Sequence, residues 1–436
     1  MNYLQTLDYL FSKLPLFSRV GPAAYKKDLT NTLLLCEFLG NPQRSLRTVH
    51  VAGTNGKGSV SHMLAAIFQQ AGYKTGLYTS PHLYDFRERI KINGEMIGEQ
   101  QVVDFTKNIL PTIEKIEPSF FEVTVAMALD HFNKENVDIA IIETGLGGRL
   151  DSTNVIVPDL SVITNIDWDH MQLLGDSLEK IAFEKAGIIK AGIPVVIGES
   201  SSTTLPVFQQ KAQAENTSLT IASEERTIKQ YEWKDDYLWV TIAQQKDSVL
   251  SLKLDLPGIY QTKNVLTVLA TIDQLQKKGW RLHQDHIAKG LSSTRVLTGL
   301  HGRWQKIASC PTIIIDVAHN EAGIGQLINQ LQQTSYDNLH IVLGVVKDKS
   351  ITPMLSLLPK EATYYFTKAS LPRALPEAEL RSLGEQAGCV GEAFANVNQA
   401  LTKARSTAGK NDLIVVCGSI FLAAEVNLRE GNVPLD

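Results

Sequence analysis

The chain has 436 residues, and at roughly 150 residues per domain this length predicts two or three structural domains. Apolar residues make up 44% and charged residues 20%, a globular composition that excludes a wholly disordered, collagenous or coiled-coil chain. The 42 Lys and Arg residues stand against 46 Asp and Glu, so a net charge of −4 provides no broad attraction for nucleic acids or anionic membranes. We therefore expect no nucleic acid and no membrane among its partners. We further expect a monomer whose partners are small molecules.

The cysteines and the N-terminus indicate the compartment. Cys36, Cys310, Cys389 and Cys417 are far apart and show no CxxC spacing, which favours reduced, buried thiols over disulfides or a zinc ribbon. Residues 1–17 form an amphipathic helical pattern rather than a signal peptide, and no stretch approaches the roughly 18 apolar residues of a membrane span. The sequence predicts a cytoplasmic protein.

From residue 45 to residue 199, apolar runs alternate with helical patterns, which is typical of a parallel sheet with crossover helices. The expected strands are 49–53, 76–79, 138–143, 160–165 and 194–198. The expected helices are 57–71, 123–132 and 177–186. Residues 89–97 contain Ile-Asn-Gly-Glu, a hairpin signal. Residues 217–256 alternate as an antiparallel edge would, before two further helical patterns at 262–278 and 284–293.

The periodicity stops at residues 295–302, which reads as a linker, and a second alternation follows. Its expected strands are 312–317, 339–346, 363–366 and 412–418, and its expected helices are 321–333, 377–386 and 396–408. We predict an α/β protein with an N-terminal domain over residues 1–296, built on a mainly parallel sheet plus a small antiparallel sheet. A smaller α/β domain is expected over residues 303–436.

A glycine-rich turn joins the first expected strand to a helix, and it reads Gly53, Thr54, Asn55, Gly56, Lys57, Gly58 and Ser59. Backbone N–H groups at such a turn, together with a helix N-terminus and a lysine, form a phosphate cradle. The match to the Walker A pattern is incomplete, because Val51 stands in place of glycine and Gly58 in place of Ser or Thr. A Mg²⁺ ion would therefore need oxygen ligands from elsewhere.

Polar residues follow three further strands, at the edge where open parallel sheets bind ligands. Ser80 and Glu143 are candidates for Mg²⁺, although a serine before proline is more often a turn cap. From spacing alone His170 is a general base or a capped histidine, since magnesium prefers oxygen. The cluster 145–148 lacks the full spacing of a dinucleotide fingerprint, and we reject it as a cofactor site.

Two further positions have both a structural and a functional interpretation. Lys185 stands at the end of an expected helix, where a lysine is usually a solvated cap. Asp316 ends an apolar strand and is followed by His319 and Asn320, so a ligand-facing strand end is expected there. Arg303, just after the linker, could reach the same site.

Six sequence blocks occur in one order along nearly the whole chain. They are GTNGKGS at 53–59, YTSPHL at 78–83, ETGLGGRLD at 143–151, DWDH at 167–170, EKAGIIK at 184–190 and DVAHN at 316–320. Together they resemble the folylpolyglutamate synthase and dihydrofolate synthase family of the Mur ligase superfamily. The resemblance implies an N-terminal Mur-ligase-type P-loop ATPase domain and a Rossmann-like C-terminal domain, with ATP bound between them.

The resemblance also implies roles for individual residues. Residues 53–59 would bind ATP, with Asn264 on the adenine side and with Arg303 and Asp316 as further nucleotide contacts. The implied Mg²⁺ ligands are Ser80, Glu143, His170 and a carbamylated Lys185; Phe121 would lie at the pterin pocket, and His319 and Ser419 would receive glutamate. Four residues depart from the family pattern, namely Tyr260, Val317, Glu321 and Cys417.

The activity implied is an ATP-dependent amide ligase that uses ATP and Mg²⁺ and proceeds through an acyl phosphate. It would add L-glutamate to dihydropteroate and extend the γ-glutamyl chain of folates, with Lys57, Lys185 and His319 as catalytic residues. One alternative is chain extension only. An alternative from another class is a P-loop kinase or NTPase module.

Overall fold

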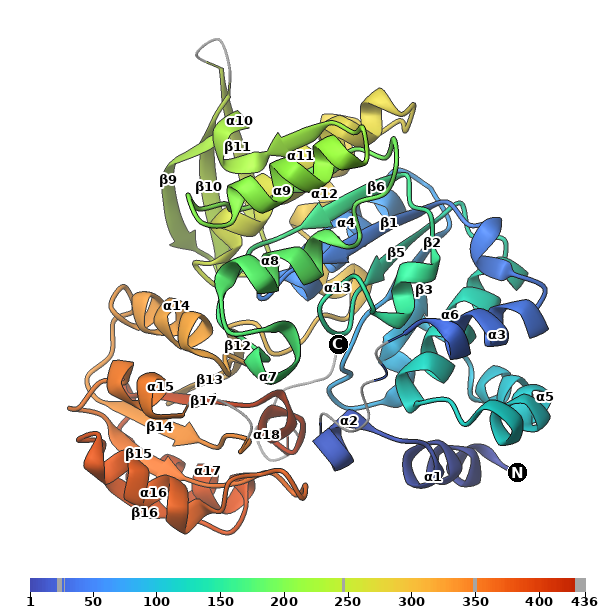
Figure 1. The fold of residues 1–436 in the computed structure, drawn as a ribbon. Coiled ribbons are helices and arrows are strands. Elements are labelled where there is room, and N and C mark those ends of the chain that lie inside the picture. The colour runs from blue at the N-terminus through green and yellow to red at the C-terminus, as the bar shows by residue number, and fades with distance from the viewer. Residues whose placement is uncertain (22–25, 27, 245–247, 348–350, 428–436) are drawn as a thin grey trace. The chain divides into compact units, whose positions relative to one another are not determined.

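The computed structural model describes residues 1–21, 26, 28–244, 248–347 and 351–427 (Figure 1). By its internal contacts the chain divides into two compact units. The first unit contains residues 1–167, 171–255 and 260–300, and the second contains 168–170, 256–259 and 301–436. Each unit has its own sheets and its own apolar core.

The first unit is built on an eight-stranded sheet with the order β4-β3-β2-β5-β1-β6-β7-β8. The strands are β1 (Thr48–Ala52), β2 (Thr75–Tyr78), β3 (Ile90–Ile92), β4 (Glu95–Met96), β5 (Ile139–Glu143), β6 (Leu160–Ile163), β7 (Val195–Ile197) and β8 (Leu219–Ile221). The neighbouring strands in β2-β5-β1-β6-β7-β8 all pair in parallel, whereas the β2–β3 and β3–β4 pairs are antiparallel. Every residue of β1, β5 and β6 is buried, as expected for strands covered on both faces.

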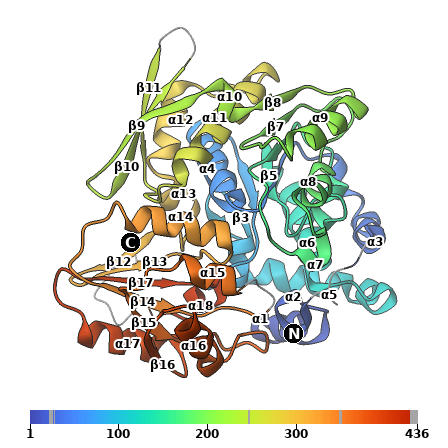
Figure 2. The same cartoon turned by 60° about the vertical axis from the view of Figure 1, so that its left-hand side comes forward.

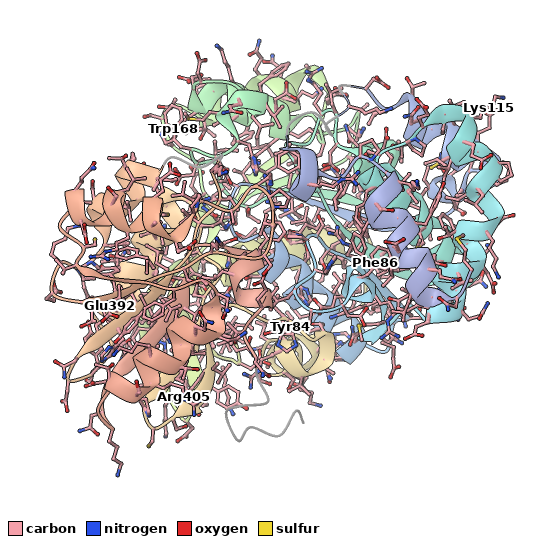
Figure 3. The ribbon with its side chains drawn as sticks, turned by 90° about the horizontal axis from the view of Figure 1, so that it is seen from below. Tyr84, Phe86, Lys115, Trp168, Glu392 and Arg405 are labelled. Atoms are coloured by element: carbon pink, nitrogen blue, oxygen red, sulfur yellow. The ribbon has the colours of Figure 1, made fainter. Side chains whose placement is uncertain are left out.

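The helices of the first unit follow in chain order. They are α1 (Tyr3–Lys13), α2 (Phe17–Val20), α3 (Thr30–Phe38), α4 (Lys57–Gln70), α5 (Glu99–Ile116), α6 (Phe120–Lys134), α7 (Met171–Leu174), α8 (Leu178–Ala186), α9 (Leu205–Ala214), α10 (Ala222–Glu225), α11 (Gln261–Lys277), α12 (Gln284–Leu291) and α13 (Thr294–Thr298). Helices α4 and α11 pack on each other and on the central strands (Figure 2). Phe86 is buried against Phe120 of α6, whereas Lys115 of α5 is exposed (Figure 3).

The expected hairpin at residues 89–97 is confirmed. Strands β3 and β4 are joined by Asn93 and Gly94, which have φ angles of 51° and 83°. Two positive φ angles in succession are what a type I′ turn requires, and Asn-Gly adopts them readily.

The expected antiparallel segment forms a separate three-stranded sheet in the first unit (Figure 1). Its strands are β9 (Thr227–Lys234), β10 (Tyr237–Ala243) and β11 (Val249–Leu254), in the order β11-β10-β9. On β10, Leu238, Val240 and Ile242 are buried while the residues between them are more exposed, which is the alternation read from the sequence. The predicted small antiparallel sheet is thereby confirmed, and its strands form a sheet of their own rather than an edge of the large one.

The second unit contains a six-stranded sheet with the order β12-β13-β17-β14-β15-β16, in which only β12 is antiparallel. Its strands are β12 (Gln305–Ser309), β13 (Thr312–Ile315), β14 (Leu339–Leu343), β15 (Thr363–Phe366), β16 (Gly391–Ala393) and β17 (Leu413–Cys417). Its helices are α14 (Glu321–Leu331), α15 (Ile351–Leu357), α16 (Glu377–Gln386), α17 (Val397–Thr407) and α18 (Ile420–Ala424).

Two expectations need correction. The segment expected to be a linker contains the helix α13, whose second residue, Arg295, donates its backbone N–H to Asp255 at 2.7 Å. All four cysteines are free, but Cys310 is exposed, because it lies in the turn between β12 and β13.

Among the described residues, no helix is both long enough and apolar enough to cross a bilayer.

Candidate functional site

The strand order of the first sheet gathers four chain segments at one edge. Strands β2, β5, β1 and β6 are consecutive neighbours and run parallel, so their carboxyl ends lie side by side. Ser80 follows β2, Glu143 ends β5, Gly53 follows β1 and Thr164 follows β6. The candidate site of the first unit therefore occupies the position at which open α/β sheets bind ligands.

Two glycines of the phosphate loop have no room for a side chain. Gly53 has a φ of 149°, and a Cβ there would lie 1.8 Å from Oγ1 of Thr164. Gly56 has a φ of 82°, and a Cβ there would lie 2.4 Å from Oδ1 of Asn264. Both the backbone conformation and the close neighbours require glycine.

The loop is also held by hydrogen bonds from the segment after β6. Asn165 accepts from the backbone N–H of Thr54 at 3.0 Å and, through its side chain, from that of Asn55 at 2.8 Å. Thr164 Oγ1 donates to the carbonyl of Asn55 at 2.5 Å. Helix α4 begins directly after this loop, so its N-terminal N–H groups and positive dipole end are available to an anion.

Two lysines converge on the carbonyl of Gly53. Lys57 Nζ donates to this oxygen at 2.9 Å and to the carbonyl of Thr54 at 3.0 Å, while Lys185 Nζ donates to the Gly53 oxygen at 2.8 Å. Lys185 is only 4% exposed, so the interpretation of this residue as a solvated helix cap is wrong. Packing of α8 against the strand ends turns its last helical residues inward.

Ser80 and Glu143 are adjacent at the same edge. The Glu143 side chain is buried, and its Oε2 accepts from the backbone N–H of Ser80 at 3.1 Å. In the described part of the chain the Ser80 hydroxyl has no hydrogen-bond partner. A carboxylate beside a hydroxyl is a set of hard oxygen donors, so these two residues fit Mg²⁺.

No three His, Cys, Asp or Glu side chains of the described residues are arranged to hold a metal ion. His170 belongs to the segment 168–170 of the second unit, whereas Glu143 belongs to the first. The role of His170 as a metal ligand stays a prediction.

The glycine cluster after β5 packs against helix α8. A Cβ on Gly148 would lie 2.8 Å from the carbonyl of Lys185, and Arg149 donates its backbone N–H to the carbonyl of Glu184 at 2.7 Å. The Arg149 guanidinium also forms an ion pair with Glu184. Glycine at position 148 allows close packing beside Lys185.

Asp151 organises this loop, and we did not single it out from the sequence. It is 2% exposed and accepts hydrogen bonds from the backbone N–H groups of Leu146 at 2.7 Å and Thr153 at 3.0 Å. Burial raises the pKa of Asp151 despite these hydrogen bonds, which act in the opposite direction. The signal was its place at the end of the ETGLGGRLD block.

The two aromatic residues at the start of α6 differ in burial. Phe120 is buried and stacks on Phe11 with ring centroids 5.2 Å apart, while Phe121 is half-buried. A Cβ on Gly145 would lie 2.4 Å from the Phe121 ring, so this ring covers the glycine cluster.

His82 is a second buried polar residue that the sequence analysis did not single out. Burial and the neighbouring Arg89, which donates to its Nδ1, lower the pKa of His82 to about 3.

In the second unit, Asp316 holds the backbone around the end of β13. Its two oxygens accept from the N–H groups of Trp304 and Ala318, both at 2.9 Å. His319 Nε2 lies 3.6 Å from Oδ2 of Asp169, and its Nδ1 is 2.9 Å from the carbonyl of Val317.

The remaining second-unit candidates have local hydrogen bonds. Ser419 accepts from the N–H of Phe421 and so caps α18. Arg303 donates to the carbonyl of Gly302 at 3.3 Å. None of these contacts tests a role in binding nucleotide or glutamate.

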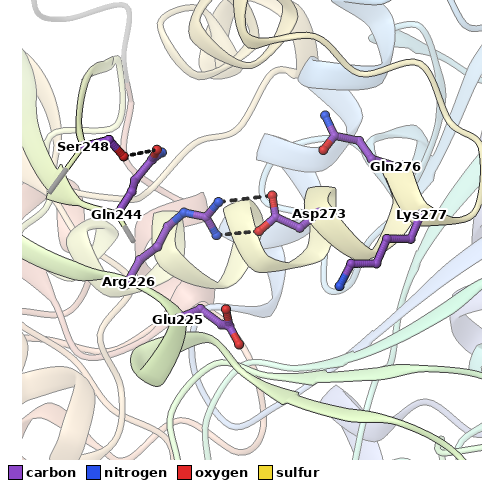
Figure 4. Close-up of a pocket in the computed structure, with 7 residues that line it drawn as sticks. All are labelled: Glu225, Arg226, Gln244, Ser248, Asp273, Gln276 and Lys277. Atoms are coloured by element: carbon purple, nitrogen blue, oxygen red, sulfur yellow. Dashed lines mark hydrogen bonds and ion pairs between the residues drawn. The ribbon is translucent and has the colours of Figure 1, made fainter. Parts of the chain in front are cut away.

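A surface pocket beside the three-stranded sheet contains none of the predicted site residues (Figure 4). Arg226 and Asp273 form a two-point ion pair across it, and Gln276 and Lys277 extend from α11 along its edge.

Comparison with known proteins identifies the family. Residues 51–272 match the Mur ligase middle domain, and residues 302–420 match the Mur ligase glutamate ligase domain. This chain belongs to the Mur ligase family. The resemblance and the fold class inferred from the sequence are thereby confirmed.

Individual relatives give a finer description. The chain is 34% identical to a folylpolyglutamate synthase of Lacticaseibacillus casei, with 98% of each chain covered. It is 30% identical to a dihydrofolate synthase/folylpolyglutamate synthase of Bacillus subtilis, covering 90% of this chain and 92% of that protein. Among solved structures, a Mycobacterium tuberculosis folylpolyglutamate synthase complexed with ADP superposes with a TM-score of 0.87 at 30% identity, covering 97% and 96% of the two chains.

Proposed function

We propose that this Mur ligase family member joins L-glutamate to folate-type acceptors at the expense of ATP. The relatives confirm the predicted enzyme class, an ATP-dependent ligase of the folate synthase type. The observation that supports it most directly is the phosphate loop with Lys57 and Lys185, which lies at the same sheet edge as Glu143. A phosphate-binding cradle beside a buried carboxylate is suited to phosphoryl transfer.

The chemistry begins with transfer of the γ-phosphoryl group of ATP to the acceptor carboxylate. The loop amides and the N-terminus of α4 bind the phosphates, and the Lys57 ammonium stabilises the charge that develops on them. Glu143 and Ser80 would hold Mg²⁺, which when bound neutralises phosphate charge. The glutamate amine then attacks the acyl carbon of the acyl phosphate, so that an amide forms and phosphate leaves.

The other roles are part of this proposal. Asn264, Arg303 and Asp316 would contact the nucleotide, and Phe121 would contact the pterin. His170 and a carbamylated Lys185 would complete the metal ligands, and His319 and Ser419 would bind the incoming glutamate. The domain limits 1–296 and 303–436, a monomeric state and a cytoplasmic location likewise remain predictions.

The test separates the alternatives by their products. The protein is incubated with ATP, Mg²⁺, glutamate and either dihydropteroate or tetrahydrofolate, and the products are weighed by mass spectrometry. We expect ADP, phosphate and a new amide in equal amounts with both acceptors. An amide with tetrahydrofolate only indicates chain extension alone, and a stable phosphorylated product without amide indicates a kinase.

The variant Lys57→Ala tests the role of the phosphate loop in the same experiment. We expect the amide product to fall by about 10²–10³-fold, because one preorganised charge at the transferred phosphoryl group is removed. The melting temperature should stay close to that of the unmodified protein, since the Lys57 side chain is half-buried and its ammonium donates to carbonyls of the loop instead of packing in the core. Unchanged turnover would contradict the assignment.

A further inference from the structure

One fully buried side chain links helices α4 and α11 behind the phosphate loop. Gln261, the first residue of α11, has no exposed surface. Its Nε2 donates to Oγ of Ser59 at 3.1 Å, and its Oε1 accepts from Nδ2 of Asn264 at 2.8 Å. Ser59 and Asn264 are also buried, so the hydrogen-bonded chain from Asn264 through Gln261 to Ser59 is shielded from water.

The direction of these hydrogen bonds determines what the Ser59 hydroxyl can do. A hydroxyl group has one proton to donate and two lone pairs that accept. Because Ser59 Oγ accepts from Gln261, one lone pair is occupied and the hydroxyl proton is left to donate to another group. Ser59 is the third residue of α4, within the helix turn whose N–H groups are oriented to bind an anion.

The same side chain fixes a second point of the loop. Asn264 Oδ1 lies so close to Gly56 that a Cβ there would be 2.4 Å away. Since Gln261 holds the amide of Asn264, it also fixes Asn264 against the residue that caps α4. Gln261 therefore holds the loop both at Gly56 and at Ser59.

We propose that Gln261 is a positioning residue for the nucleotide, which holds Asn264 and the phosphate loop in one arrangement and directs the Ser59 hydroxyl proton toward a phosphate oxygen. The inference rests on the proposed function, because it assumes that the loop binds ATP. Among the described residues, Gln261 has no side-chain hydrogen bond to Ser80 or Phe121. The effect should therefore concern the nucleotide and leave binding of the acceptor unchanged.

The first test uses Gln261→Leu, which keeps the approximate volume and removes both hydrogen bonds. We expect the KM for ATP and the Kd for ADP, measured by calorimetry, to rise about tenfold, as for the loss of one or two buried hydrogen bonds. The KM for glutamate and for the pterin acceptor should stay within about twofold. An unchanged ADP affinity would overturn the proposal.

Gln261→Glu tests the direction of the Ser59 hydrogen bond. A carboxylate at this position accepts from both Asn264 and the Ser59 hydroxyl, so the shape is kept but the hydroxyl proton now points away from the loop. We expect ADP affinity to fall at least as far as in Gln261→Leu. A carboxylate here would also repel the phosphates, so a loss of affinity alone does not separate positioning from packing, but normal ADP binding by a folded Gln261→Glu would overturn the proposal.

Thr271→Ala is the matched control. Thr271 lies on the same helix, is equally buried, and donates to the carbonyl of Thr267 within α11. We expect this variant to lower the melting temperature without changing the affinity for ADP.

A double-mutant cycle then tests whether Gln261 acts through Ser59. In a Ser59→Ala background, Gln261→Leu should have much less effect on ADP affinity than in the unmodified protein. Fully additive effects would contradict the mechanism. Because ADP binding needs no ligation, this readout decides the inference even if no amide product forms, an outcome that would refute the proposed function instead.

Discussion

Lys185 has surroundings that differ from those of a solvated lysine at the end of a helix. It is buried in the last turn of α8, and its Nζ donates to the Gly53 carbonyl that also accepts from Lys57. Carbon dioxide reacts with the neutral form of an amine, and the carbamate that results carries anionic oxygen in place of the ammonium charge. A carbamylated Lys185 would present anionic oxygen to Mg²⁺ at this edge.

We expect Lys185→Ala to abolish most of the ligase activity, with partial recovery when a short carboxylic acid is added to the buffer. Lys180→Ala is the control, because Lys180 is an exposed lysine of the same helix that pairs with Asp176. A crystal structure of the unmodified chain at high bicarbonate should show the carbamate at Lys185, and a plain ammonium there would contradict it. Near-normal turnover of Lys185→Ala would remove the hypothesis.

Asp412 provides a test of pH dependence away from the site. Burial by itself would raise the pKa of Asp412, but hydrogen bonds from the Gly409 N–H, His340 and Asn338 outweigh it and lower the pKa below its ordinary value of 3.8. A carboxyl group with a lowered pKa stabilises the fold above its unfolded-state pKa, and this contribution is lost as the pH falls through the lower folded-state value.

We therefore expect the unfolding free energy to decrease as the pH falls below about 4, and Asp412→Asn to reduce this dependence. Denaturant titrations between about pH 5 and pH 2 measure it. Asp337→Asn, at an exposed carboxylate nearby, is the control and should leave the slope unchanged. An identical slope in Asp412→Asn would contradict the prediction.

At the scale of elements, the two glycines at the ends of helix α4 allow the effect of backbone strain to be distinguished from the effect of steric crowding. Gly56 and Gly72 flank helix α4 and have nearly equal φ angles of 82° and 83°. A Cβ on Gly56 would meet Asn264, whereas a Cβ on Gly72 has no heavy atom within 4 Å.

Both Gly56→Ala and Gly72→Ala should lose about 1–2 kcal/mol, because alanine is strained in the left-handed region. Only Gly56→Ala should also weaken ADP binding, since the new methyl group displaces Asn264 from its place against the loop. Melting curves and ADP calorimetry on the two variants measure these effects. Equal ADP affinities would show that Asn264 adapts without consequence.

Local patterns identified most helices and strands, but not all of them. The expected helix 57–71 is observed as Lys57–Gln70, and the expected strand 138–143 as Ile139–Glu143, because glycine turns and apolar runs mark their limits. Helix α5 was not predicted, and it contains Pro111, which in isolation argues against a helix. The short strand β16 contains Gly391 and Glu392, which have low strand propensity, and pairing with β15 stabilises it.

At the scale of the whole molecule, local sequence patterns could not give the order of the strands. The position of β1 between β5 and β6 depends on how the crossover helices pack, and this order brings Glu143 and Thr164 next to Gly53. Ser80, Glu143 and Asp316 could be named as candidates because each stands at or just after the end of a strand. Asn264 and Phe121 lie on helices, and only the resemblance pointed to them. That Lys185 is buried against Gly53, and that Gln261 bridges Ser59 and Asn264, are tertiary facts that no local pattern contains.

The two units have separate cores, which makes their unfolding separable. One core includes α6 and the strands around β5, and the other contains β13, β14, β15 and β17. Gly56 belongs wholly to the first unit, and the pair of His340 and Asp412 wholly to the second.

We expect differential scanning calorimetry without ligands to show two transitions, as is common for two-domain proteins. Gly56→Ala should lower only the transition of the first unit, and Asp412→Asn only that of the second. Because each substitution changes contacts within one unit, the double variant should show both shifts, each in its own transition. A single transition that both substitutions lower would instead mean that the two units unfold as one cooperative structure.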